Sequence, residues 1–176
     1  MRFFILTIFL TICFSVFGQV DSFQKSIIDC LYLNGTPAKY SKVYDQTLEI
    51  LINRFETANV PEDFWKELKT DKEEKINELI PFLAFAYRKH FNEEDIVLMT
   101  AFYKTEAAQT MLVNPKTLTE AQNEEIKVFL ESDIGLKIET KQAELSTDIT
   151  DIIANWKRDL FSEKMGTLVK SGYSPQ

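Results

Sequence analysis

The chain has 176 residues, with 27 acidic and 20 basic side chains and a formal net charge of −7 at pH 7. This acidic balance argues against binding to nucleic acid or to an anionic membrane surface, because both would repel the protein. The length is that of one domain, and a chain of this size buries enough surface to form a core without disulfide bonds.

The N-terminal segment predicts a secretory signal peptide over residues 1–18. Arg2 supplies the positive end, the stretch of residues 3–17 carries no charge, and small or medium-sized residues precede Gln19 at the positions that signal peptidase reads. We therefore expect an exported protein, periplasmic or extracellular, that begins at Gln19 after cleavage.

Two alternatives to cleavage fit the N-terminal segment less well. A retained membrane anchor would need about 20 consecutive apolar residues, more than this stretch provides. A lipid-modified Cys13 would normally follow a small residue, whereas Ile12 precedes it here. We expect no stable membrane anchor once the signal has been removed.

Cys30 is the one cysteine beyond the predicted signal, so no internal disulfide is expected even in an oxidising compartment. A lone thiol on an amphipathic helix is most often a small buried residue. The alternative is an intermolecular disulfide or a reactive thiol.

Every sustained pattern beyond the signal is helical, since no run of residues alternates between apolar and polar in the manner of a strand. The sequence predicts an all-α fold, a compact bundle of about six to eight amphipathic helices in a single domain over residues 19–162. Residues 163–176 hold two glycines and a proline and predict a flexible C-terminal tail. The expected helices span about residues 20–33, 36–58, 61–69, 70–91, 92–103, 105–113, 119–131 and 132–161.

Local signals mark where several of these helices start and stop. Gly35 is expected to end the first helix, and Thr36 to cap the second. Thr70 and Glu73 match a capping box at the start of a longer helix. Pro81 lies inside that helix and predicts a kink over about residues 77–81, because proline removes one backbone hydrogen bond and clashes with the preceding turn.

Two segments 27 residues apart, beginning at Asn92 and Thr119, share one pattern. Each has a capped helix, an aromatic residue about three turns later, and a second Ser or Thr cap followed by an acid and a small residue. The paired positions are Phe102 and Phe129, Thr105 and Ser132, Glu106 and Asp133, and Ala108 and Gly135. We interpret this as an internal helix-cap-helix repeat.

Each copy is expected to work as a structural joint between helices. The hydroxyl caps the next helix, the acid meets the positive end of its dipole, and the small residue admits a close neighbour. The predicted joint residues are Phe102, Tyr103, Thr105, Glu106, Ala108, Phe129, Ser132 and Gly135.

The stretch YRKHFNEEDIVLMTAFYKTEAAQ, residues 87–109, resembles the core of the DUF2059 family of small exported helical bacterial proteins. The family pattern is roughly Tyr-x-Lys-x-Phe-Ser/Thr-x-x-Glu, followed by Phe-Tyr-x-Ser/Thr-Pro-x-Gly-Gln. The matching residues are Tyr87, Lys89, Phe91, Phe102, Tyr103, Thr105 and Gln109.

The departures from that pattern are Asn92 for Ser or Thr, Asp95 for Glu, Glu106 for Pro and Ala108 for Gly. Each replacement keeps the physical role of a cap, a capping acid, a helix start or a small residue. The resemblance covers residues 79–113 best. It implies an exported helical protein of unknown function, and it lends no catalytic residue.

No group of residues predicts a catalytic, cofactor or metal site. His90 stands three and four residues before Glu93 and Glu94, a ligand spacing, but Asn92 is expected to interrupt the helix and a single histidine makes a poor zinc site. We expect His90 to be solvated or to cap a helix. The acids in residues 71–74 and 93–95 fall in predicted first turns, where the helix dipole explains them.

Two functional hypotheses follow. The first is a non-catalytic envelope protein whose surface or groove engages a partner protein or a second copy of itself. The second is a carrier that holds a small apolar ligand between its helices, lined by Phe102, Tyr103, Trp65 or Trp156. An enzyme that uses Cys30 or the acid clusters is a third possibility for which the sequence names no set of residues.

Overall fold

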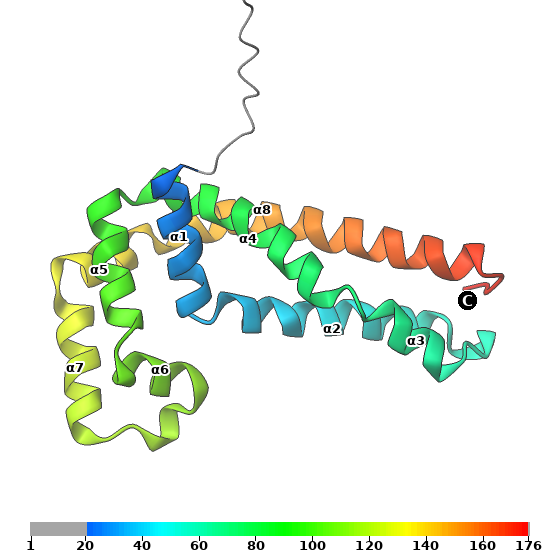
Figure 1. The fold of residues 1–176 in the computed structure, drawn as a ribbon, viewed down its shortest axis with the longest axis horizontal. Helices are drawn as coiled ribbons and strands as arrows, with labels where there is room; N and C mark the ends of the chain where they lie inside the picture. The colour runs from blue at the N-terminus through cyan, green and yellow to red at the C-terminus, as the bar shows by residue number, and fades with distance from the viewer. Residues whose placement is uncertain (1–20, 176) are drawn as a thin grey trace, which may run out of the picture.

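The structure, a computed structural model, describes residues 21–175, and the predicted signal peptide lies outside this range. The described part consists of helices and their connections, without a strand, which confirms the all-α prediction (Figure 1). The α-helices are α1 (Ser22–Leu33), α2 (Thr36–Arg54), α3 (Glu62–Leu68), α4 (Lys72–His90), α5 (Glu93–Tyr103), α6 (Glu106–Val113), α7 (Glu120–Glu131) and α8 (Asp133–Lys170). Two short 3₁₀ helices, η1 (Glu56–Ala58) and η2 (Pro115–Thr117), lie in the connections.

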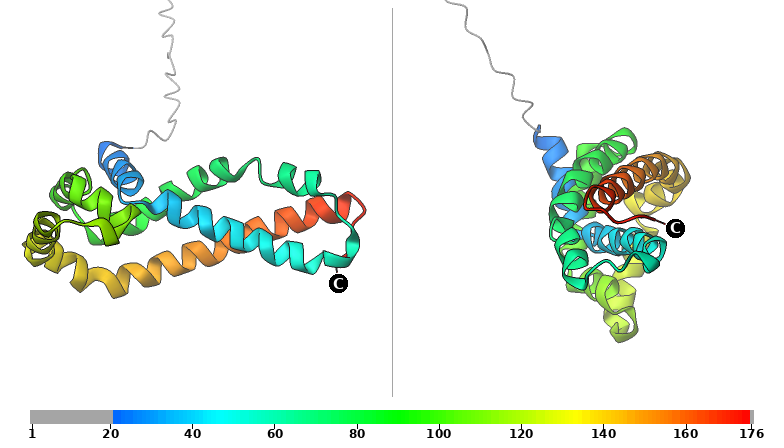
Figure 2. Two further views of the ribbon diagram at one scale, coloured as in Figure 1. Left: turned by 90° about the horizontal axis from the view of Figure 1, so that it is seen from below. Right: turned by 90° about the vertical axis from the view of Figure 1, so that its right-hand side faces the viewer.

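Three long helices, α2, α4 and α8, lie side by side and form an elongated body (Figure 2). At one end α1 packs against α4 and α5, and α5, α6 and α7 project as a lobe (Figure 1). At the other end lie α3 and the C-terminal end of α8. Within residues 21–175 no helix is both long enough and apolar enough to cross a membrane.

The core forms three connected regions along this shape. The first joins α1, α4 and α5 to the start of α8, the second joins α2, α3 and the end of α8, and the third lies within the lobe. Fully buried large side chains mark the first two regions, and they include Ile27, Leu31, Tyr44, Leu48, Leu51, Phe55, Leu79, Ile80, Leu83, Ile96 and Leu168.

The helix caps predicted around the lobe are confirmed. The Asn92 side chain accepts a hydrogen bond from the Asp95 N–H at 2.9 Å, and the Asp95 carboxylate accepts one from the Asn92 N–H at 2.7 Å. Thr119 caps α7 and forms a capping box with Gln122, the residue three positions on. Thr105 caps α6 and Ser132 caps α8 through their hydroxyl groups. Whether the two segments are copies of one repeat stays a prediction.

Two other predicted helix starts are wrong, each for a visible reason. Thr36 is the first residue of α2 rather than its cap, because Gly35 in the left-handed conformation (φ 78°) turns the chain before it. Thr70 lies one position before Asp71, the residue at the N-cap of α4, and its hydroxyl donates to the Glu67 carbonyl at 2.8 Å. Helix α4 begins after Asp71, whose carboxylate has partners elsewhere in the fold.

Pro81 lies inside α4, as the sequence requires. Its carbonyl accepts a hydrogen bond from Gln24 Nε2 at 3.0 Å, which ties α4 to α1. The kink expected over residues 77–81 stays a prediction.

Helix α8 is longer than the sequence indicated. It was expected to end near Phe161, yet it continues to Lys170. The continuation is held by packing, since Leu168 is fully buried and Tyr173 places its ring against that of Phe64 at 5.3 Å. The prediction of a tail beyond residue 162 is therefore wrong for residues 163–170.

Candidate functional site

The three aromatic residues of the predicted joints meet in the lobe. The rings of Phe102 and Phe129 are stacked in parallel, with centroids 3.7 Å apart, and Tyr103 meets Phe102 edge-on at 5.3 Å. The sequence aligned Phe102 with Phe129 as equivalent positions, but it did not predict that the two rings would touch. They join α5 to α7 directly.

The two small residues of the joints occupy tight positions. Ala108 is fully buried in the core of the lobe. A Cβ atom built on Gly135 would lie within 3.0 Å of backbone atoms of Phe129 and Leu130, in the last turn of α7. Gly135 therefore permits the close approach of α8 to the end of α7.

An open groove, here called the lobe groove, runs between α5 and α7 with a volume of about 510 Å³. Its lining residues are Leu98, Ala101, Phe102, Thr105, Glu125, Val128, Phe129, Ser132, Asp133 and Ile134. Two apolar side chains of the groove face solvent, Leu98 with 46% of its surface exposed and Val128 with 60%. Four of the eight predicted joint residues thus line one surface groove.

The lobe also carries most of the formal net charge. Residues 92–133 include nine acidic and three basic side chains, so they account for −6 of the formal charge of −7. Asp95 forms an ion pair with Lys137 of α8, at 2.5 Å. Glu125 and Asp133 lie at the groove itself. An apolar groove with an acidic rim is the result.

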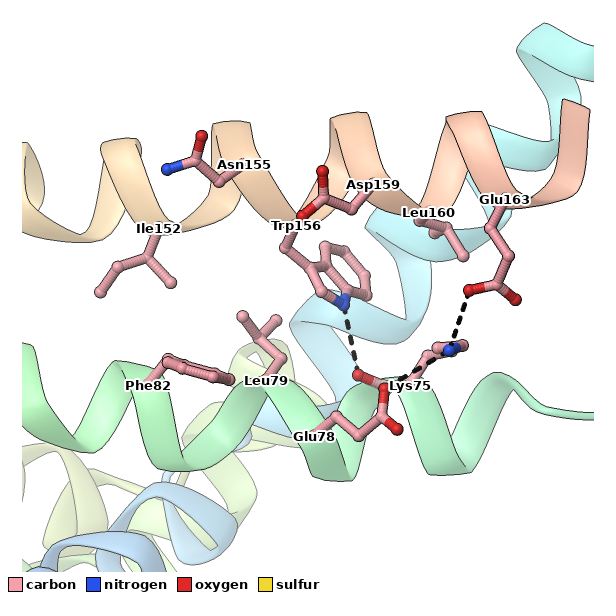
Figure 3. A pocket seen from close by; sticks show the side chains of 10 residues that line it. All are labelled: Lys75, Glu78, Leu79, Phe82, Ile152, Asn155, Trp156, Asp159, Leu160 and Glu163. Atoms are coloured by element: carbon pink, nitrogen blue, oxygen red, sulfur yellow. Dashed lines mark hydrogen bonds and ion pairs between the residues drawn. The ribbon is translucent and has the colours of Figure 1, made fainter. Parts of the chain in front are cut away.

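A second concave site, here called the α4–α8 cleft, lies between the two long helices on the body (Figure 3). Its volume is about 380 Å³, and its lining residues are Lys75, Glu78, Leu79, Phe82, Ile152, Asn155, Trp156, Asp159, Leu160 and Glu163. The apolar side chains of Leu79, Phe82 and Ile152 gather toward one end, and charged side chains gather toward the other (Figure 3).

Hydrogen bonds fix the middle and the charged end of the cleft. The indole N–H of Trp156 donates to the carbonyl of Lys75 at 3.2 Å. The ammonium of Lys75 lies 3.0 Å from Glu163 and 3.5 Å from Glu78. The hydrogen bond that Lys75 donates to Glu163 raises the pKa of Lys75 above its ordinary value, although burial acts in the opposite direction. Lys75 is therefore a cation that is already paired.

The four aromatic residues that the carrier hypothesis named lie in different places. Trp156 lines the α4–α8 cleft, and Phe102 lines the lobe groove. Trp65, a residue of α3, packs against the second core region at the end of the body away from the lobe. Tyr103, the last residue of α5, is partly buried against both the first and the third core regions, and burial raises the pKa of its hydroxyl.

The prediction that His90 is solvated or caps a helix is wrong. Helix α8 covers its ring, which is 5% exposed, and the ring nitrogens lie 2.6 Å from Asp148 and 3.4 Å from Glu144. Lys89 adds a further ion pair to Asp148 at 2.8 Å, and its hydrogen bond together with that of His90 holds the pKa of Asp148 below its ordinary value. This cluster fastens the end of α4 to the middle of α8.

The described residues hold no group of three or more histidine, cysteine, aspartate or glutamate side chains arranged to bind a metal ion. The acids that follow His90 in sequence, Glu93 and Glu94, lie in the first turn of α5. Helix α4 ends at His90, so the expected interruption between the histidine and these acids is confirmed.

A buried polar cluster, at the end of the body away from the lobe, was not predicted from the sequence. Lys164, almost fully buried, is bonded to Asp71, and the Tyr44 hydroxyl lies 2.7 Å from the same carboxylate and 2.9 Å from the Leu68 carbonyl. Burial alone would raise the pKa of Asp71, but the hydrogen bonds from Lys164 and Tyr44 outweigh it and hold the pKa below its ordinary value. The cluster joins α2, α4 and α8.

Cys30 is buried in the first core region, as the lone-thiol pattern favoured. Burial raises the pKa of its thiol, so the thiolate that a nucleophile requires is disfavoured.

Comparison with known proteins identifies one segment of the chain. Residues 77–114 match the model of a family described as "Uncharacterized protein conserved in bacteria (DUF2059)". No curated protein matches the chain, and no solved structure matches it either. The matched segment runs from the middle of α4 through α5 and α6, and it includes the first joint. The predicted relation to the DUF2059 family is thereby confirmed for residues 77–114.

Proposed function

We propose that this is a non-catalytic helical protein, exported to the bacterial envelope, that binds a partner protein through the lobe groove. The observation that carries the proposal is the combination of an open apolar groove with an acidic lobe, in which residues 92–133 hold −6 of the chain's charge of −7. An exposed apolar groove rimmed by polar residues is typical of an interaction site.

The chemistry of the groove favours a basic amphipathic helix as its occupant. An amphipathic helix lays its apolar face into such a groove, with anchors spaced by three or four residues. Leu98 and Val128 would receive those anchors, and Glu125 and Asp133 would face basic side chains beside them. The acidic lobe would also accelerate the encounter with a basic partner by electrostatic steering.

The reactive side chains support a non-catalytic role. The thiol of Cys30 lies in the core, and both ring nitrogens of His90 face carboxylates of α8. The buried cluster of Asp71 and Lys164 holds three helices together. Each of these groups has a structural partner that explains its position.

A designed peptide tests the proposal. Calorimetric titration with a helical peptide of leucine and lysine should show binding, and the same design with glutamate for lysine should not bind. Val128→Arg removes an apolar contact and adds a repelling charge, so it should weaken binding at least about tenfold. Val169→Arg, at a site 50% exposed near the end of α8, is the matched control and should leave binding unchanged.

Equal losses in the two variants, or equal binding of the acidic peptide, would contradict the proposal. The same pair of variants tests self-association. If light scattering shows a dimer that Val128→Arg dissociates and Val169→Arg does not, the occupant of the groove is a second copy and the proposal of a basic helix is wrong.

A second candidate function, carriage of a small molecule with an apolar part, is favoured by the α4–α8 cleft. The cleft volume of about 380 Å³ falls in the lower part of the range of roughly 300–1,000 Å³ found for small-molecule sites. Its apolar end is formed by Leu79, Phe82 and Ile152.

A further inference from the structure

We propose that the α4–α8 cleft binds a small organic cation that has an apolar or aromatic body, such as an alkyl or aryl ammonium compound. The inference rests on the carrier function proposed above and names its ligand class. Three features of the cleft lead to it: an exposed apolar end, an excess of acidic side chains, and a tryptophan between the two.

The apolar end of the cleft carries an aromatic ring that is exposed to solvent. Phe82 lies on the wall of the cleft and has 59% of its surface exposed, beside the buried Leu79 and the half-buried Ile152. A ligand body placed against Phe82 would remove this ring from water, and burial of apolar surface is the main source of affinity in such sites. This end of the cleft fits a hydrocarbon or aromatic group.

The charged end favours a positive group on that ligand. Glu78, Asp159 and Glu163 line the cleft together with one base, Lys75, which leaves two negative charges in excess. The Lys75 ammonium is held by Glu163 and Glu78, so it is not free to receive a carboxylate or phosphate from a ligand. Asp159 has a further neighbour in Arg158 at 3.4 Å, but Arg158 does not line the cleft.

Trp156 stands between the apolar and charged ends (Figure 3). Its hydrogen bond to the Lys75 carbonyl fixes the indole between the two helices. The face of an indole attracts cations and not anions, because the ring carries a negative quadrupole. An ammonium group near Trp156 would therefore meet both this ring and the acids, whereas an anion of the same shape would be repelled.

Tryptophan fluorescence provides the test. The chain has two tryptophans, so Trp65→Phe leaves Trp156 as the single reporter inside the cleft. The probes are decyltrimethylammonium, decanol and decanoate, each below its micelle concentration, because they share one chain and differ in charge. The cation should bind at least about fivefold more tightly than decanoate. Calorimetry on the unaltered protein checks the same ranking without the substitution.

Matched variants locate the site. Phe82→Ala should weaken binding of all three probes about tenfold, since the ring would cover part of the ligand. Phe85→Ala, one turn along α4 at a position 60% exposed and outside the cleft, should change none of them. Glu78→Gln should reduce the preference for the cation about two- to fivefold, while Glu74→Gln, on the same helix and outside the cleft, should leave it intact.

The outcomes separate the inference from the carrier function. Equal affinity for the three probes would overturn the cation preference and leave the carrier function standing. Absence of binding by every probe would overturn both. Equal losses in Phe82→Ala and Phe85→Ala would show that the probes bind outside the cleft, and that result would also overturn the inference.

Discussion

We expect Gly135→Ala to destabilise the protein, because the start of α8 lies very close to the last turn of α7. Gly135 lies in the first turn of α8, and an added Cβ would fall within 3.0 Å of backbone atoms of Phe129 and Leu130. If the neighbouring atoms belonged to a side chain, that side chain could rotate away from the new methyl group. They belong to backbone carbonyl groups at the end of α7, which cannot rotate away. The ends of α7 and α8 must therefore move apart to accept the methyl group.

The magnitude follows from two opposing effects. Overpacking of a tight site typically costs about 1–3 kcal/mol. Alanine is favoured over glycine inside a helix by roughly 0.5–1 kcal/mol, which offsets part of that cost. The expected net loss in the free energy of unfolding is about 1–2 kcal/mol, which lowers the melting temperature by about 2–8 °C in a chain of this size.

Thermal unfolding followed by circular dichroism measures this loss, with Gly166→Ala as the matched control. Gly166 lies in the same helix, and no atom lies within 4 Å of the position of its added Cβ. The control should therefore gain roughly 0.5–1 kcal/mol, or about 1–4 °C. If Gly135→Ala were as stable as Gly166→Ala, the close approach of α7 and α8 would not constrain position 135.

Three further predictions concern the cap, the thiol and the acids. Thr105→Ala should lower the free energy of unfolding by about 1 kcal/mol in urea titrations, and an unchanged value would refute the capping role. Cys30 should react with a thiol reagent only after denaturation, because its thiol is buried and burial raises its pKa; rapid labelling of the native protein would contradict this. Asp71 has a folded pKa below the ordinary value of 3.8, held down by Lys164 and Tyr44 against the effect of burial. Its contribution to stability should be present above pH 3.8 and lost as the pH falls through the lower folded pKa. Urea unfolding of the protein and of Asp71→Asn should converge at low pH, and a constant difference between them at every pH would refute this role.

The features that could be predicted from the sequence are those set by neighbouring residues. The capping box of Asn92 and Asp95 is a pattern of four residues, and its hydrogen bonds form within those residues. The caps at Thr105 and Ser132 are local in the same way. Because helix starts follow from short-range hydrogen bonds, the boundaries of α5, α6 and α7 were close to the prediction.

The features that could not be predicted depend on contacts distant in sequence. His90 meets Asp148, 58 residues away, a partner that no residue near it in the chain indicates. Lys164 reaches Asp71 across 93 residues, and this contact helps to keep the end of α8 in place, in a segment whose glycines and proline predicted a flexible tail. Tertiary packing overrides local helix propensity in such places.

The lobe groove could be predicted only in part. The sequence singled out Phe102, Thr105, Phe129 and Ser132 as residues of two joints, and the structure places all four on one groove. Their roles as caps and aromatic contacts were local predictions. The groove arises because the two segments face each other, and no pattern within either segment contains that information.

The central claim is that the lobe groove binds a basic amphipathic helix. Amide hydrogen exchange of the protein, with and without the leucine–lysine peptide, tests it most directly. The account predicts slower exchange in α5 and α7 on binding, unchanged exchange in α3 and at the end of α8, and loss of the effect in Val128→Arg. Protection confined to helices outside the lobe, or protection of α5 and α7 that persists in Val128→Arg, would contradict it.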